Sequence, residues 1–207
     1  MVTTHTAEAH YAFELSGGRL CLDFVNTVSN RGSEAPVDHL RSYGDFLSFC
    51  EQAHAVPAAL LRQLAKEAAA HPAAARSALS QAVAVREALF HVFDAISAGR
   101  RPRPVDLAVV NEHVPAAFAR SRVTADADRY TLIVDAADGD LLSPLAPIVK
   151  SAVDLLTSAD VDRVRACAAE TCEWLFMDTT KNRTRRWCAM KVCGNREKVR
   201  RFRSRAS

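Results

Sequence analysis

The sequence predicts a mainly α-helical protein. A helical N-terminal domain over residues 1–160, with one small β-hairpin, precedes a small module over residues 161–207. Apolar residues recur every three or four positions through most of the first part, which is the period of an amphipathic helix. The last 45 residues hold four of the six cysteines, in two close pairs. At 207 residues, 49% of them hydrophobic, the chain is long enough for one ordinary domain and a small appended one.

Short helices are expected up to residue 70. The first covers residues 20–28, where apolar side chains recur at helical spacing, with a strand as the alternative. Asp38 is a suitable N-cap for a second helix that ends near residue 54. Pro57 stands where a first-turn proline would stand, and an Ala- and Leu-rich helix follows it.

The longest predicted helix begins at Pro72 and ends at Gly99. One of its faces is apolar along its length, through Leu79, Ala82, Val85, Leu89, Phe93 and Ile96. A stiff connector rich in Arg and Pro follows, and then a helix over residues 106–118. Alternating residues over 122–135 predict a hairpin, and the last helix of the domain opens at Ser143.

The net charge is unevenly distributed along the chain. Residues 163–207 hold 13 Lys and Arg against 4 Asp and Glu, a net charge of +9. The other 162 residues hold 14 Lys and Arg against 20 Asp and Glu, a net charge of −6, so the whole chain carries +3. An acidic body joined to a basic tail is typical of a regulator whose tail meets nucleic acid.

Several classes of protein are not expected from this sequence. No apolar run approaches the roughly 20 residues of a membrane span, and the first residues lack a secretion-signal pattern, so a cytoplasmic protein is expected. A reducing cytoplasm keeps thiols free and favours metal binding over disulfides. The sequence has no glycine-rich phosphate loop, nucleophile elbow or His-Glu-x-x-His motif, so an enzyme is not predicted.

The clustered cysteines have the spacing Cys-x4-Cys-x15-Cys-x4-Cys and are Cys167, Cys172, Cys188 and Cys193. Two close pairs can place four thiolates at the corners of a tetrahedron, which suits Zn²⁺. Two disulfides, four unrelated thiols or an iron–sulfur cluster are the alternatives. Four protein ligands leave no open coordination position, so the predicted zinc is structural. Substitution of Cys188 is expected to release the metal and unfold only the tail.

The order of elements in the module is knuckle, hairpin and helix, with the last cysteine at the start of the helix. This order is the plan of a treble-clef zinc module, with the hairpin between the two cysteine pairs. In the predicted helix over residues 195–205, Val199 and Phe202 share a narrow apolar face. We expect that face to dock on the hairpin.

Eight basic residues of the module are candidates for contact with DNA: Lys181, Arg183, Arg185, Arg186, Arg196, Lys198, Arg201 and Arg205. Like charges at this density repel one another, and the phosphate backbone is the usual anion that relieves the repulsion. Docking to an acidic protein partner, or to the acidic body of the chain, is the alternative. RNA binding, with Trp174 or Trp187 stacked on bases, is a third hypothesis.

The last 45 residues resemble the CGNR zinc-finger family. The motifs that carry the resemblance are Cys193-Gly194-Asn195-Arg196, Trp174-x-Phe176-x-Asp178, Lys181-Asn182 and Arg185-Arg186-Trp187-Cys188. Thr180-Lys181 stands where many relatives have Ser-Arg, which keeps a hydroxyl and a positive charge. The resemblance implies that the four clustered cysteines are the zinc ligands.

Residues 18–28 resemble the start of the ABATE domain that precedes this finger, mainly through Leu22-Asp23-Phe24-x-Asn26-Thr27. The two resemblances together cover nearly the whole chain. The family is regarded as bacterial stress-induced transcription regulators, so the resemblance implies a regulator whose finger binds DNA.

Polar residues interrupt the first apolar segment of the N-terminal domain. Asp23 and Asn26, with Arg31 and Asp38 in the following loop, are candidates for lining a pocket for a small-molecule effector. The alternative is that they cap helices and form internal hydrogen bonds. Alanine-rich helical domains often associate, so a homodimer is also a hypothesis.

Overall fold

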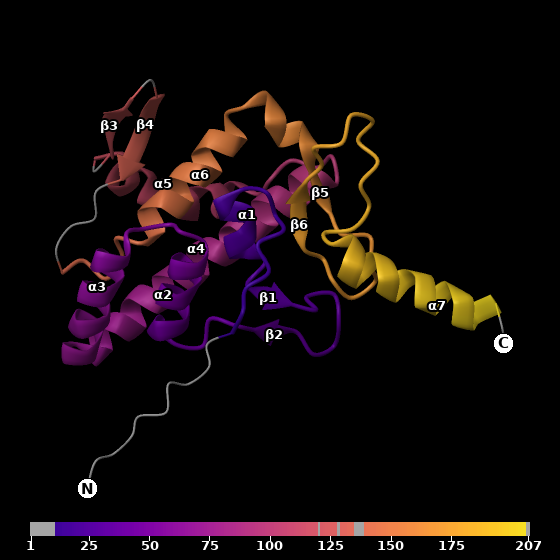
Figure 1. The fold of residues 1–207 in the computed structure, drawn as a ribbon, viewed down its shortest axis with the longest axis horizontal. Coiled ribbons are helices and arrows are strands. Elements are labelled where there is room, and N and C mark those ends of the chain that lie inside the picture. The colour runs from indigo at the N-terminus through magenta and orange to yellow at the C-terminus, as the bar shows by residue number, and fades with distance from the viewer. Residues whose placement is uncertain (1–10, 120, 128, 135–138, 206–207) are drawn as a thin grey trace, which may run out of the picture.

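The computed structural model describes residues 11–119, 121–127, 129–134 and 139–205; the side chains of 126, 131–134, 201, 204 and 205 lie outside this description. The helices are α1 (Leu20–Val25), α2 (Tyr43–Gln52), α3 (Ala58–Ala70), α4 (Pro72–Ser97), α5 (Pro104–Ala119), α6 (Leu145–Leu156) and α7 (Asn195–Arg205). Three antiparallel two-stranded sheets pair β1 (Val28–Ser29) with β2 (Val37–Asp38), β3 (Ser121–Asp126) with β4 (Arg129–Val134), and β5 (Val164–Ala166) with β6 (Leu175–Met177). The predicted mainly α-helical fold is confirmed (Figure 1).

The long helix α4 is the centre of the N-terminal domain. Helices α1, α2, α3 and α5 pack against it, and α6 packs against α1 and α5. The apolar face of α4 that the sequence predicts packs into the core: Val85, Leu89 and Phe93 are buried, and Leu79 and Ile96 are partly buried. Phe24 of α1 and Phe46 of α2 are also fully buried in this core. Each such side chain removed from water stabilises the fold by about 1.5–3 kcal/mol.

The start of α2 differs from the prediction. Ser42, not Asp38, is its N-cap, because the Ser42 hydroxyl accepts from the Asp45 amide while the Asp45 carboxylate accepts from the Ser42 amide. Asp38 instead lies in β2, where its carboxylate accepts hydrogen bonds from Arg86 of α4. A partner 48 positions away cannot be recognised from local sequence.

Smaller differences concern the ends of elements. The helix predicted over residues 20–28 ends at Val25, and Val28 begins β1. The predicted hairpin is present as β3 and β4. The connector after α4 is short because Pro104 is already the first residue of α5, where its fixed φ and missing N–H are tolerated.

The C-terminal module shares the core of the N-terminal domain. Leu175 and Met177 of β6 are buried in the same apolar cluster as Phe24. The pair β5–β6 encloses the first two cysteines, whereas the sequence predicted a hairpin between the two pairs. Residues 178–188 contain no strand. The predicted domain boundary near residue 160 falls at a 3₁₀ turn, Ala159–Arg163, and stays a prediction.

Candidate metal centre and basic surface

Four buried sulfur atoms converge in the C-terminal module. They belong to Cys167, Cys172, Cys188 and Cys193, and lie within 4.8 Å of one another. The first pair sits on the turn between β5 and β6, where the Cys167 amide donates to the Trp174 carbonyl at 2.8 Å. The second pair comes from the end of the loop after β6 and from a π-helical turn, Met190–Gly194, that leads into α7.

A zinc ion fits this arrangement of sulfurs. Zn–S bonds of about 2.3 Å in a tetrahedron place the sulfurs about 3.8 Å apart. The Sγ atom of Cys188 lies 3.7 Å from that of Cys172 and 3.6 Å from that of Cys193. All six cysteines of the chain are free, so the alternative of two disulfides does not match the structure.

The protein supports the sulfurs with hydrogen bonds and apolar contacts. Hydrogen bonds from the Cys172 and Cys188 thiols lower the pKa of the Cys167 thiol, and the Cys188 amide, 3.4 Å from that sulfur, adds to the effect. The pKa values of the other three thiols are raised, those of Cys172 and Cys188 by their hydrogen bonds to Cys167 and that of Cys193 by burial, so these thiols must release protons when a metal binds. Trp174 and Phe176 are buried beside the sulfurs, and the partly buried Trp187 packs against them.

Asp178 organises the loop between the two cysteine pairs. Its fully buried carboxylate accepts from the amide and hydroxyl of Thr180, at 2.9 and 2.6 Å, and from the Arg185 amide at 3.0 Å. Burial alone would raise the pKa of Asp178, but these hydrogen bonds outweigh it and hold the pKa below its usual value. The Thr180 hydroxyl also accepts from the Thr184 amide, so the hydroxyl at this position has a structural use.

Arg185 makes its contacts inside the module, and its predicted contact with DNA stays a prediction. Its guanidinium donates to the carbonyls of Met177, Trp187, Ser16 and Cys188. It also lies over the Phe176 ring, 4.3 Å from the ring centroid. Most of its donors are therefore occupied, and Arg185 holds the second cysteine pair against β6.

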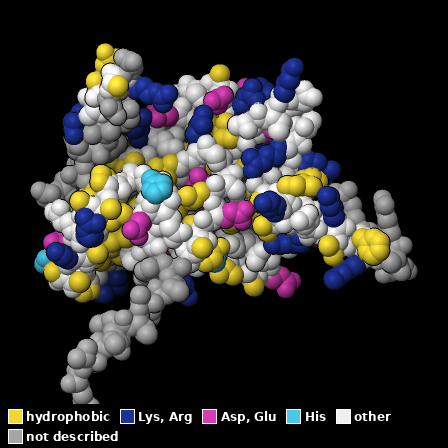
Figure 2. All heavy atoms as spheres, viewed as in Figure 1, with side chains coloured by type: hydrophobic (Ala, Val, Ile, Leu, Met, Phe, Trp, Pro, Cys, Tyr) yellow, Lys and Arg dark blue, Asp and Glu magenta, His cyan; other side chains and the backbone are white. Residues whose placement is uncertain are grey.

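Five of the eight candidate residues have exposed side chains: Lys181, Arg183, Arg186, Arg196 and Lys198. The first three lie on the loop before the second cysteine pair, and the last two on the first turn of α7. Figure 2 shows Lys and Arg side chains distributed over the C-terminal module, among apolar and other side chains. The side chains of Arg201 and Arg205 lie outside the described residues. Five of the eight predicted residues are therefore exposed, on the loop that leads to Cys188 and on the helix that follows Cys193.

The apolar face of α7 does not dock as predicted. Val199 is 51% exposed and Phe202 is 76% exposed. The helix is anchored through its first turns, where Glu197 is buried and Arg200 bridges Glu197 and Glu170 at 2.9 Å each. Beyond this anchor α7 projects away from the molecule (Figure 1). Sequence spacing shows that residues share a face but not what lies opposite that face.

Asp23 and Asn26 make internal hydrogen bonds. The Asn26 side chain pairs with the backbone of Leu175, with its Nδ2 donating at 2.8 Å and its Oδ1 accepting at 2.9 Å. Asp23 accepts from the Gly17 amide at 2.7 Å, while burial raises the pKa of Asp23 to about 6. These contacts match the sequence alternative of internal hydrogen bonding.

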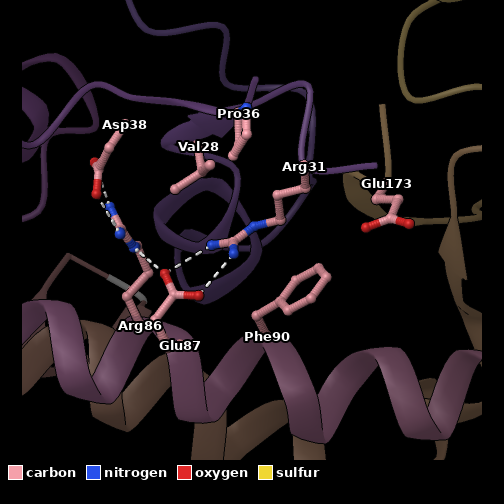
Figure 3. Close-up of a pocket in the computed structure, with 8 residues that line it drawn as sticks. All are labelled: Val28, Arg31, Pro36, Asp38, Arg86, Glu87, Phe90 and Glu173. Atoms are coloured by element: carbon pink, nitrogen blue, oxygen red, sulfur yellow. Dashed lines mark hydrogen bonds and ion pairs between the residues drawn. The ribbon is translucent and has the colours of Figure 1, made fainter. Parts of the chain in front are cut away.

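A cavity of about 360 Å³ lies between α4, the loop after β1 and the turn that carries the first cysteine pair (Figure 3). Arg31 and Asp38, which the sequence singled out, line it. Arg86 and Glu87 of α4, which the sequence did not indicate, also line it. Arg86 is only 2% exposed. Its spacing from Ala82 and Leu89 places it on the apolar face of α4, and this spacing could have indicated that the side chain is buried.

Comparison with known families identifies both parts of the chain. Residues 18–159 match the family model of the ABATE domain, described as "Putative stress-induced transcription regulator", and residues 163–206 match the CGNR zinc finger. No curated protein matches the chain. Among the described helices, none has the length and apolar character to cross a membrane. The zinc-finger match and the four converging sulfurs establish structural zinc as the cofactor. The chain therefore belongs to the ABATE family and carries a CGNR zinc finger over residues 163–206.

Proposed function

We propose that this protein is a zinc-dependent transcription regulator that responds to stress and binds DNA through its C-terminal module. The observation that carries the proposal is the exposure of Lys181, Arg183, Arg186, Arg196 and Lys198, which lie on the loop that leads to Cys188 and on the helix that follows Cys193. Zinc fixes the loop and the start of α7 relative to each other, so these charges are held on one rigid unit. The family description of the N-terminal domain supports the regulatory part.

Two parts of the basic surface would have different roles on DNA. The loop residues Lys181, Arg183 and Arg186 would contact phosphates, which supply affinity and position without reading sequence. Arg196 and Lys198 are exposed on the anchored first turn of α7, the rest of the helix projects from the molecule, and such a helix can enter the major groove. A site without open zinc coordination suits a binding role, so we propose no catalytic activity. Free thiols suit the reducing cytoplasm.

Fluorescence anisotropy with random duplex DNA across a salt series tests the proposal. The logarithm of affinity should fall linearly with the logarithm of salt concentration, by a slope of about 0.9 per neutralised phosphate. The double variant Arg196→Ala and Lys198→Ala should lower both the affinity and the slope. Lys66→Ala, on the exposed surface of α3, is the matched control and should change neither. Affinity that does not depend on salt would contradict the proposal.

A protein partner is the second candidate, and the exposed Val199 and Phe202 favour it. Apolar side chains on a projecting helix are typical of an interaction surface. Binding of RNA by stacking is less well supported, because Trp174 is buried and its indole donates to the Val28 carbonyl at 2.8 Å. Salt-dependent binding to single-stranded RNA that exceeds duplex DNA binding would favour the RNA hypothesis. A homodimer and a small-molecule effector of the N-terminal domain remain part of the proposal.

A further inference from the structure

The cavity in Figure 3 lies where the N-terminal domain meets the zinc module. Helix α4 contributes Arg86, Glu87 and Phe90, the loop after β1 contributes Arg31, and the cysteine-bearing turn contributes Glu173. Its volume of about 360 Å³ falls within the range of small-molecule sites. A molecule bound here would touch both parts of the chain at once.

Both arginines of the cavity have carboxylate partners inside the protein. Arg31 donates two hydrogen bonds to Glu87, at 2.6 and 2.9 Å. Arg86 donates to both oxygens of Asp38, at 2.8 and 2.7 Å, and to Glu87 at 2.8 Å. The positive charges are therefore matched one for one by Asp38 and Glu87, and the cavity has no surplus positive charge for an anion.

Glu173 supplies a third carboxylate, and it has no such partner. Among the described residues, none forms an ion pair or hydrogen bond with its side-chain oxygens. Figure 3 shows Glu173 on the zinc-module side of the cavity, across from Arg31 and Phe90. The lining of the cavity thus carries one surplus negative charge, located at Glu173.

The backbone at Glu173 is strained. Its φ of 55° lies in the left-handed region. Glycine adopts this conformation without steric cost, whereas the Cβ atom of a glutamate makes it unfavourable. On the opposite loop, a Cβ added to Gly32 would lie 3.0 Å from Glu173 Oε1, so the loop approaches this carboxylate closely. Strained residues tend to occur at binding sites, where the surrounding structure holds them. A glutamate at this position is consistent with a use for its carboxylate.

We propose that this cavity binds a small organic cation, an amine or amidine with an apolar body, whose positive group pairs with Glu173. Phe90, Val28 and Pro36 provide apolar wall for the body of the ligand. The ligand joins the zinc-binding turn to α4 and β1, so it stabilises the contact between the two parts of the chain. This inference does not depend on DNA binding, and its test uses no nucleic acid.

Benzamidine is a suitable probe because its planar cation can form paired, charge-assisted hydrogen bonds with a carboxylate. Benzamide has nearly the same shape without the charge. Isothermal titration of the zinc-loaded full chain should show benzamidine binding about tenfold or more tightly than benzamide. Glu173→Gln should remove most of this difference and leave the weak binding of benzamide unchanged.

Glu34→Gln is the matched control, since Glu34 is an exposed carboxylate on the loop after β1 that does not line the cavity. It should bind benzamidine as the wild type does. Zinc content and melting temperature of Glu173→Gln, measured alongside, should equal those of the wild type because the side chain is exposed. Equal affinity for the two probes, absence of benzamidine binding, or unchanged benzamidine affinity in Glu173→Gln would each overturn the inference.

Discussion

At the scale of single residues, Asp23 is a carboxylate whose ionisation opposes folding. Burial raises its pKa to about 6, above the value of 3.8 expected in the unfolded chain, and the hydrogen bond from Gly17 offsets the burial only in part. Between these two values the folded state holds more protons than the unfolded state. The free energy of unfolding should therefore fall as pH rises from about 4 to about 6.

Asp23→Asn should remove this loss, because the amide oxygen can still accept from Gly17 without carrying a charge. The variant is expected to be more stable than the wild type at pH 7 and nearly equal to it at pH 4. Urea denaturation at both pH values measures the difference. Asp38, Glu87 and Asp178, whose pKa values are lowered, lose their contributions below about pH 4 in both proteins and cancel in the comparison. A variant less stable than the wild type at pH 7 would contradict the argument.

At the scale of elements, the decisive contact is between α1 and β6. Asn26 is the residue after α1. Its side-chain amide donates to and accepts from the backbone of Leu175, as the backbone of a neighbouring strand would. Asn26→Ala leaves a buried N–H and a buried carbonyl without partners. The free energy of unfolding should fall by about 2–6 kcal/mol, because each of the two unpaired groups costs about 1–3 kcal/mol.

Urea denaturation of the zinc-loaded protein measures this loss. Asn111→Ala, on the exposed face of α5, is the control and should change stability by less than about 0.5 kcal/mol. If the two variants were equally stable, water would have to replace the Asn26 hydrogen bonds, and β6 would not depend on this contact.

The local sequence predicts most of the helices but not all of their contacts. Helices α3, α4, α5 and α6 were predicted because their apolar periodicity and proline positions are local signals. The cap of α2 was predicted wrongly because the partner of Asp38 is Arg86, on a distant helix. The uncovered face of α7 was also predicted wrongly, since Val199 and Phe202 have the spacing of buried residues but project from the molecule.

The candidate sites were also predictable only in part. The cysteine cluster was predictable because metal geometry restricts spacing. The use of Arg185 was not, because it depends on carbonyl groups that only the folded loop brings together. The pairing of Asn26 with Leu175 likewise joins residues 149 positions apart. Contacts of this range set which polar residues are structural and which remain exposed for binding.

At the scale of the whole molecule, the zinc module and the helical body share one core. Leu175 and Met177 of β6 are buried with the residues of α1, and the Trp174 indole donates to the backbone of β1. From the sequence alone, substitution of Cys188 is predicted to unfold only the tail. The shared core changes this expectation, because a module that loses its metal also withdraws β6 from the body.

Cys188→Ser should therefore lower the melting temperature of the helical signal as well as release zinc. Apparent binding energies of structural zinc are on the order of 10 kcal/mol, comparable to the entire stability of a typical domain. Circular dichroism at the helical bands and a zinc assay would measure both effects in one sample. Adding a chelator to the wild type should reproduce the loss, and adding it to Cys188→Ser should change nothing further.

A body that melts at the wild-type temperature after the metal has left would show that β6 contributes little to the core. The module would then fold on the body without supporting it, and the coupling through Asn26 would also be small.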